Sequence, residues 1–382
     1  MEHHLDSALR GPPAGVRFLA RSVQARNEAS TRLREWLAAR NLDTGTRGSV
    51  DLSASSTVLR ARLRCGETRA WTPGCNTLGL SRILGFEPGS PADLQREIAI
   101  GLLMSPVAFD FPDVDEFESA VRIRMLTVEA ARRTVLDFAP EAIERPGDCW
   151  DYDPRTGFTV RAGHQLIDAL RKATQPDLTG RRYAFSCYRA TEYVMLLAIA
   201  QEAAQSNPSL LMRIQALAHR RAVQSREFHE VYLREYGSLR HPLPLGYFVP
   251  GDRVWFRNPD AASAQVEGYE GSWVIYLGAG QFCNFWQSDR PFTLEHKCLE
   301  IFHWRHAVCT DADGKLRIDE DEVEQRVADS LTDPARTHSI LGRMQRARAP
   351  RGVFDRGGCL DATRECARWI RPTACGIAVP AE

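Results

Sequence analysis

Tyr183-Ala184-Phe185-Ser186-Cys187 opens the stretch that decides how this sequence folds. The residues that follow are apolar at helical spacing, and Asn207-Pro208 interrupts the pattern because the residue before a proline disfavours the helical conformation. We therefore expect a helix that begins at or near Cys187, ends at Asn207, and is apolar enough to be held against a sheet.

Cys187 is a candidate nucleophile because of its place at the start of this helix. Unpaired amide N–H groups at a helix start favour a thiolate, and the same groups can hold the oxyanion that forms when a thiolate attacks a carbonyl. The alternative is that Cys187 is one more buried, reduced thiol among the ten cysteines of the chain. Position alone leaves both interpretations open.

Composition excludes several classes of partner. Lys plus Arg equals Asp plus Glu at 49 each, so no bulk charge attracts nucleic acid or an anionic membrane. The sequence has no apolar run long enough to span a bilayer and no secretory signal, which predicts a cytoplasmic protein. The cysteines contain no Cys-x-x-Cys pair, so we expect neither a metal site nor a bound cofactor.

Helices come first along the chain and strands follow. We predict helices over residues 91–104 and in the segment after Asp113. Asp113 with Glu116 forms a candidate capping box. Beyond Gly246 short strand-like runs alternate with turns, and the turn residue Asp252 has an expected structural role. The pattern predicts an α+β fold with an antiparallel meander.

Three regions are expected. Residues 1–75 form an N-terminal extension with a helix near 26–40 and a linker over 41–56, and residues 76–345 form the core. Residues 346–382, an Arg- and Gly-rich tail, are expected to be peripheral. Within the core, we expect helices over 210–235 and 294–308.

Four blocks of sequence, in this order, resemble the bacterial spore-coat-type protein-glutamine γ-glutamyltransferases, or transglutaminases. They are Pro106-Val107-Ala108-Phe109-Asp110-Phe111 with Arg122-Ile123-Arg124-Met125, then Tyr183-Ala184-Phe185-Ser186-Cys187, then Gly251-Asp252-Arg253-Val254-Trp255-Phe256-Arg257-Asn258-Pro259, and finally Gly271-Ser272-Trp273-Val274-Ile275-Tyr276-Leu277-Gly278.

The resemblance implies a papain-like or NlpC/P60-like core, in which a nucleophile helix packs on an antiparallel sheet. It implies that Cys187 attacks the side-chain carboxamide of a protein glutamine, releases ammonia and forms a thioester, which a lysine amine of a second protein converts into an isopeptide bond. The partners would be proteins that carry Gln and Lys side chains. Calcium is not expected to be required.

The chain departs from the family at three acid–base positions, where it has Ser186, Ser272 and Phe285. Glu270 lies two residues before Ser272 and would share its face of a strand, so we expect Glu270 to act as the base and Glu270→Gln to lower activity. Three histidines are alternatives: His296, His303 and His306.

The missing acid–base residues keep two further functions open. One is a thiol hydrolase, such as a protein-glutamine deamidase or amidase, on the same core. The other is a catalytically inactive scaffold.

Overall fold

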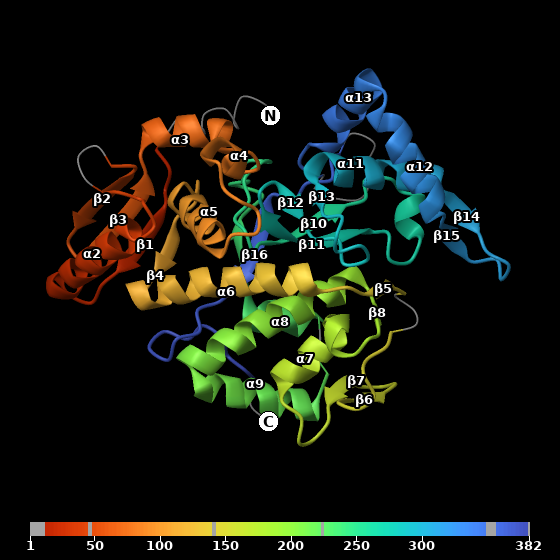
Figure 1. Cartoon of the computed structure of the whole chain (residues 1–382), viewed down its shortest axis with the longest axis horizontal. Coiled ribbons are helices and arrows are strands. Elements are labelled where there is room, and N and C mark those ends of the chain that lie inside the picture. The colour runs from red at the N-terminus through yellow and green to blue at the C-terminus, as the bar shows by residue number, and fades with distance from the viewer. Residues whose placement is uncertain (1–11, 45–47, 140–142, 223–224, 349–356, 381–382) are drawn as a thin grey trace.

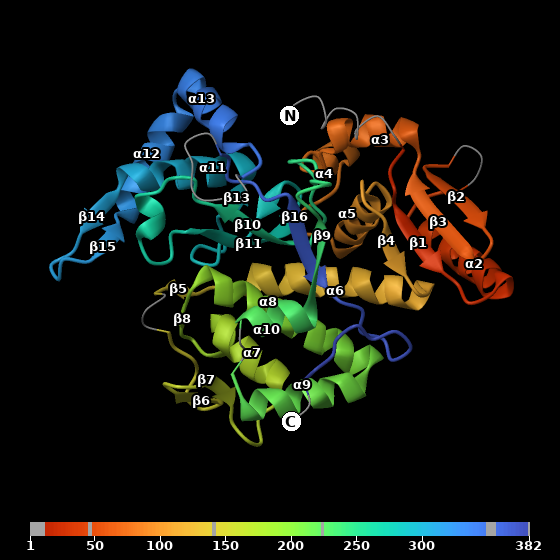
Figure 2. The same ribbon diagram turned by 180° about the vertical axis from the view of Figure 1, so that it is seen from behind.

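The computed structural model describes residues 12–44, 48–139, 143–222, 225–348 and 357–380. These residues combine helices and strands around a six-stranded sheet (Figures 1 and 2). The predicted α+β class is therefore confirmed, with long helices along one side of the sheet and a smaller sheet at the N-terminal end.

The six-stranded sheet is antiparallel throughout. Its central pair is a hairpin in which Trp255 lies opposite Trp273, with the two rings stacked 5.7 Å apart. In spatial order the strands are β13 (Phe292–Thr293), β12 (Gln281–Phe282), β11 (Gly271–Gly278), β10 (Arg253–Arg257), β16 (Thr363–Ala367) and β9 (Leu233–Gly237).

The C-terminal segment supplies an interior strand of this sheet, so the expectation of a peripheral tail is wrong for Thr363–Ala367. β16 lies between β10 and β9 and pairs with all five residues of β9. This pairing also corrects the helix expected over 210–235, because Leu233–Gly237 is extended. The chain there forms α9 (Pro208–Arg220), α10 (Ser225–Tyr232) and then β9.

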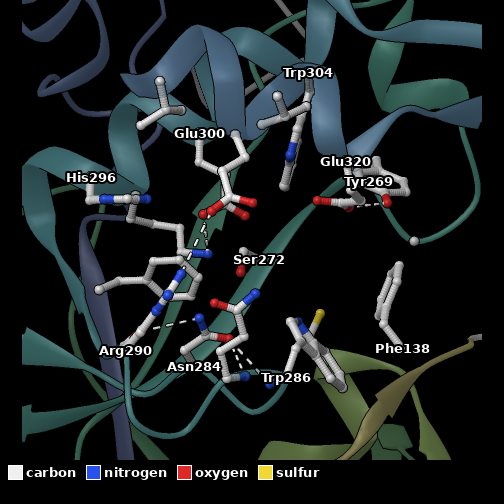
Figure 3. A pocket seen from close by; sticks show the side chains of 18 of the residues that line it. Phe138, Tyr269, Ser272, Asn284, Trp286, Arg290, His296, Glu300, Trp304 and Glu320 are labelled. Atoms are coloured by element: carbon white, nitrogen blue, oxygen red, sulfur yellow. Dashed lines mark hydrogen bonds and ion pairs between the residues drawn. The ribbon is translucent and has the colours of Figure 1, made fainter. Parts of the chain in front are cut away.

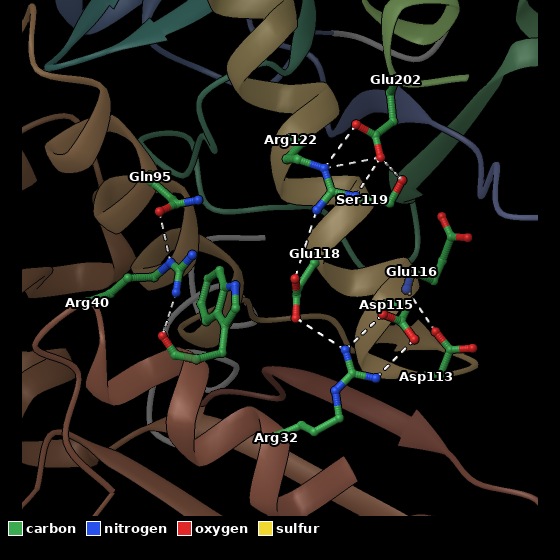
Figure 4. Close-up of polar contacts among 11 residues, drawn as sticks. Arg32, Arg40, Gln95, Asp113, Asp115, Glu116, Glu118, Ser119, Arg122 and Glu202 are labelled. Atoms are coloured by element: carbon green, nitrogen blue, oxygen red, sulfur yellow. Dashed lines mark hydrogen bonds and ion pairs between the residues drawn. The ribbon is translucent and has the colours of Figure 1, made fainter. Parts of the chain in front are cut away.

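The helix α8 (Cys187–Ser206) begins and ends where the sequence predicted. It contacts β11 and the four helices α6 (Val114–Arg133), α7 (Leu166–Thr174), α9 and α10. Burial on nearly every face explains its apolar sequence, since a helix that is apolar all round is an interior helix. Its buried Glu202 accepts hydrogen bonds from Ser119 and Arg122 of α6, at 2.7 and 2.6 Å (Figure 4).

Asp113 caps α6 as predicted, accepting a hydrogen bond from the Glu116 amide over 2.8 Å. The Glu116 side chain, however, does not complete a capping box. Its carboxylate accepts the amides of Ile370 and Arg371 at 3.1 and 2.9 Å, and thereby fixes the C-terminal segment to the start of α6.

The N-terminal residues form a second sheet with the core. β1 (Val16–Leu19) pairs antiparallel with β3 (Val58–Leu63) and parallel with β4 (Phe109–Phe111), while β2 (Val50–Ser55) pairs with β3. The helix α2 (Val23–Ala38) confirms the predicted helix, but β2 contradicts the linker expected over 41–56. This sheet joins residues on both sides of the division expected at residue 75.

Ion pairs attach α2 to α6. The Arg32 guanidinium lies 2.8 Å from Asp115 and 3.6 Å from Glu118, both on the first two turns of α6 (Figure 4). The Arg40 side chain donates to Gln95 of α5 (Pro91–Leu103) over 2.9 Å. α5 confirms the helix predicted over 91–104.

A helical unit follows the sheet and covers the end where β11, β12 and β13 lie (Figure 1). It consists of α11 (Leu294–His303), a 3-10 turn (Trp304–His306), α12 (Glu320–Leu331), α13 (Pro334–Met344) and the hairpin of β14 (Val308–Thr310) with β15 (Leu316–Ile318). The smaller elements are α3 (Cys65–Trp71), α4 (Leu80–Leu84), β5 (Asp137–Phe138) paired with β8 (Ala184–Phe185), and β6 (Trp150–Asp153) paired with β7 (Gly157–Val160).

Candidate active site

Cys187 is the first residue of α8. The preceding residue, Ser186, is the N-cap in an extended conformation, with φ −84° and ψ 155°, and its hydroxyl accepts the Arg189 amide over 3.3 Å. The short strand β8 leads directly into this cap. The sequence thus places the half-buried Cys187 at the helix end whose amide groups have no helical partners.

Aromatic packing holds the start of α8 on the sheet. The Tyr188 ring meets the Trp273 ring of β11 edge-on, with 5.3 Å between centres. The Arg253 guanidinium lies 3.8 Å from the Trp273 ring centre, and its Nε donates to Thr191 Oγ1 over 2.8 Å. Tyr188 and Thr191, which follow Cys187 on α8, are therefore held in place by residues of β10 and β11.

Cys187 lines a cavity of about 500 Å³ between the sheet and the helical unit. Figure 3 shows Ser272 from β11, Glu300 from α11 and Trp304 all facing this space. The aromatic lining consists of Phe138, Tyr269, Trp286, Phe292 and Trp304, and the polar and charged lining of Ser272, Asn284, Gln287, Arg290, His296, Lys297, Glu300, Glu320, Asp321 and Glu324.

The charged side chains of the cavity include a buried pair. The Lys297 ammonium lies 2.7 Å from Glu300 Oε2 and 3.4 Å from the centre of the Phe292 ring. On the opposite side, the Tyr269 hydroxyl donates a hydrogen bond to Glu320. The cavity can therefore accommodate both a polar carboxamide and a cationic amine next to the thiol.

Burial raises the pKa of Cys187 above that of an ordinary thiol. The amides of Trp273 and Tyr188, together with the positive charges of Lys297 and Arg253, act in the opposite direction. The direction of this pKa shift is opposite to the one expected from the helix start alone. The loss of hydration at the sulfur outweighs the amide dipoles and the two cations.

The structure does not bring Glu270 to Cys187. Glu270 directly precedes β11, is exposed, and is not among the residues that line the cavity. Of the three histidines, His296 lines the cavity and is exposed, and His306 is exposed outside its lining. His303 is fully buried, hydrogen-bonded to Ser330 at 2.8 Å, and has a pKa lowered to about 4 by burial.

Lys297 and Glu300 were missed from the sequence. Their i, i+3 spacing on a predicted helix indicates a contact with each other. It gives no sign that α11 folds back over residue 187, more than a hundred positions earlier. Phe285, which occupies one of the three acid–base positions, is buried in the core.

Among the described residues, no group of three or more His, Cys, Asp or Glu side chains could hold a metal ion. No helix in this part of the chain has the length and apolar character needed to cross a bilayer.

Residues 81–373 match the model of the protein-glutamine γ-glutamyltransferase (TGL) family. The chain belongs to this family. The match runs past the core end expected at residue 345 and includes β16. The transglutaminase from Geobacillus stearothermophilus, without its C-terminal extension, shares 20% identity with a TM-score of 0.39, over 56% of this chain and 98% of that one. A comparison with curated proteins finds no match.

Two departures from the family pattern have a structural role in this transglutaminase-family chain. Ser186 precedes the thiol and caps α8. Ser272 lies on β11 in the wall of the cavity that Lys297 and Glu300 line from α11. The cavity thus contains a carboxylate, but on a different element from Ser272.

Proposed function

We propose that the chain is a protein-glutamine γ-glutamyltransferase with Cys187 as its nucleophile, built on a papain-like core. The sulfur bonds to the side-chain carbonyl carbon of a glutamine, the C–N bond breaks, and the thiol proton leaves with ammonia. An uncharged lysine amine then attacks the thioester, forms the isopeptide bond, and returns a proton to the sulfur.

One observation carries this proposal: Cys187 heads a rigid interior helix and lines the cavity of about 500 Å³. The amides of Tyr188 and Trp273 face its sulfur, which supports a role for them in holding the oxyanion of the tetrahedral intermediate. Tyr188 and Trp273 are themselves packed together, so these donors are preorganised.

The lining supports an amine as the second substrate. Glu320, Asp321 and Glu324 of α12 lie in the cavity wall, where their negative charge favours the approach of a lysine ammonium. The aromatic rings of Phe138 and Trp286 offer an apolar passage for the aliphatic part of a side chain and limit the access of water.

Two observations favour the alternatives. Asn284, Gln287 and Arg290 make part of the wall polar, which favours water as acceptor and hence a glutamine deamidase or amidase. The raised pKa of Cys187 favours an inactive scaffold. The proposed reaction needs no calcium. A cytoplasmic location stays a sequence-based prediction.

Incorporation of a fluorescent primary amine into a glutamine-bearing protein tests the proposal, with ammonia release measured in parallel and a chelator present. We expect both signals from the wild type and neither from Cys187→Ala. Cys309→Ala, which removes an exposed thiol on β14, is the matched control and should behave as the wild type.

The outcomes separate the three functions. Ammonia release without incorporation identifies a hydrolase, and neither signal from a folded wild type identifies a scaffold. Full incorporation by Cys187→Ala contradicts the assigned nucleophile.

A further inference from the structure

Lys297 is unusual among the basic residues of this chain. The sequence has only three lysines, Lys172, Lys297 and Lys315, beside many arginines. The side chains of Lys172 and Lys315 are 36% and 41% exposed, whereas that of Lys297 is 3% exposed. Burial of an ammonium group strongly destabilises the folded protein unless the charge is paired, so the burial of Lys297 needs a physical explanation.

The immediate surroundings of Lys297 pair with its positive charge. Its ammonium lies 2.7 Å from Glu300, one turn further along α11, and 3.4 Å from the centre of the Phe292 ring. The carboxylate stabilises the ammonium directly, and the aromatic face adds a cation–π attraction.

Lys297, Glu300 and Cys187 line one cavity. Lys297 favours the charged form of the Cys187 thiol across it, and Arg253 does so from β10. The Arg253 guanidinium is, however, committed to Glu365 and to the faces of Trp273 and Tyr188. The other titratable or charged groups around the thiol are Tyr269 before β11, Cys283 after β12, Arg290 before β13, His296 on α11, and Glu320, Asp321 and Glu324 on α12.

We propose that the Lys297 ammonium is the counter-charge of the Cys187 thiolate, and that Glu300, which pairs with Lys297, offsets part of that positive charge. The inference rests on the proposed function, because it concerns how the same sulfur is activated. In this arrangement α11 supplies the charge that a neighbouring base would otherwise provide. The helical unit that contains α11 and α12 then contributes to the reactivity of the thiol at the start of α8.

The rate of alkylation of Cys187 by iodoacetamide, followed on its own peptide by mass spectrometry from pH 6 to 10, tests this directly. Lys297→Met removes the cation, so the apparent thiol pKa should rise and the rate at pH 7.5 should fall about tenfold. Glu300→Gln removes the anion that offsets Lys297, so the rate should increase. Electrostatics therefore predicts that the two substitutions change the alkylation rate in opposite directions.

Lys297→Arg keeps the charge and should restore most of the wild-type rate. Lys172→Met is the matched control on α7 and should leave the profile unchanged. An unchanged profile in a folded Lys297→Met variant overturns the proposal, and so does a slower rate in Glu300→Gln. If Lys297→Met fails to fold, the direction of the rate change in Glu300→Gln decides whether the proposal stands.

This test does not depend on transglutaminase activity. If the alkylation shifts are found but no amine is incorporated, the counter-charge inference stands and the proposed reaction fails. If amine is incorporated but Lys297→Met leaves the alkylation profile unchanged, the proposed reaction stands and the counter-charge inference fails. Loss of incorporation in Glu270→Gln, with normal incorporation in Glu300→Gln, would identify Glu270 as the base.

Discussion

The Arg124 guanidinium of α6 lies 2.7 Å from the Asp252 carboxylate, and both side chains are buried. Asp252 also accepts the Tyr236 hydroxyl at 2.5 Å and the Val249 amide at 2.7 Å. It therefore fixes the turn before β10, as the sequence suggested, and joins that turn to both α6 and β9. This carboxylate therefore connects two parts of the sheet to α6.

Asp252→Asn should destabilise the protein by about 3–5 kcal/mol, because it leaves the buried Arg124 charge without its partner. Urea unfolding at pH 7 measures the change. Asp313→Asn, at an exposed turn position, is the control and should stay within about 0.5 kcal/mol of the wild type. A loss below about 1 kcal/mol in Asp252→Asn would show that the pair is not needed.

Glu116 should make stability depend on pH. Burial raises its pKa to about 7, above the value of 4.5 that is usual for a glutamate. Between these values the folded protein binds more protons than the unfolded chain, so this group's contribution is fully present below about pH 4.5 and is lost as the pH rises through 7. The slope from Glu116 is at most about 1.4 kcal/mol per pH unit.

Urea unfolding of the wild type and Glu116→Gln between pH 5 and 8 isolates this contribution, since the other titrating groups are common to both. The wild type should lose more stability than the variant as the pH rises. Parallel curves would mean that the amides of Ile370 and Arg371 compensate for the burial of the carboxylate.

Local signals in the sequence were sufficient for single helices. Asp113 at an N-cap and Pro208 after Asn207 mark ends that depend only on neighbouring residues, and the structure has both. Strand β9 was missed because Leu233–Gly237 follows a helix and becomes extended only by pairing with residues 363–367. No local pattern shows a partner more than a hundred positions away.

The same limit applies to the site. Cys187 could be singled out because its position on a helix and the motif around it are local. Glu270 was chosen by strand alternation from Ser272, but it lies just before β11, and its side chain is exposed outside the cavity lining. Lys297 and Glu300 reach the cavity through the docking of α11, which depends on the whole tertiary structure.

Cys298 and Cys359 are expected to form a disulfide under strong oxidation. Their sulfurs are 3.6 Å apart, both residues are buried, and they join α11 to the segment before β16. Mutual interaction and burial raise the pKa of Cys298, so the reaction with diamide should be slow and follow that of exposed Cys65 and Cys309. Peptide mapping without reduction should detect the cross-link.

Closing this loop should stabilise the oxidised protein by up to about 4 kcal/mol through the entropy of the unfolded chain. Cys359→Ser provides the control, since it should show neither the cross-linked peptide nor the stabilisation. A wild type that precipitates or loses its fold on forming the bond would mean that α11 and the segment before β16 cannot approach further.

Ser186→Ala removes the hydroxyl that accepts the Arg189 amide at the start of α8. We expect a loss of about 1 kcal/mol in urea unfolding, the usual cost of an N-cap. Ser90→Ala is a matched control, because Ser90 caps α5 through an equal distance of 3.3 Å to the Asp93 amide. The two variants should lose similar stability, but only Ser186→Ala should change the alkylation rate of Cys187, since fraying of the first turn of α8 moves the thiol and the Tyr188 amide together. Equal rates in both variants would mean that the packing of Tyr188 on Trp273, and not the cap, positions the sulfur.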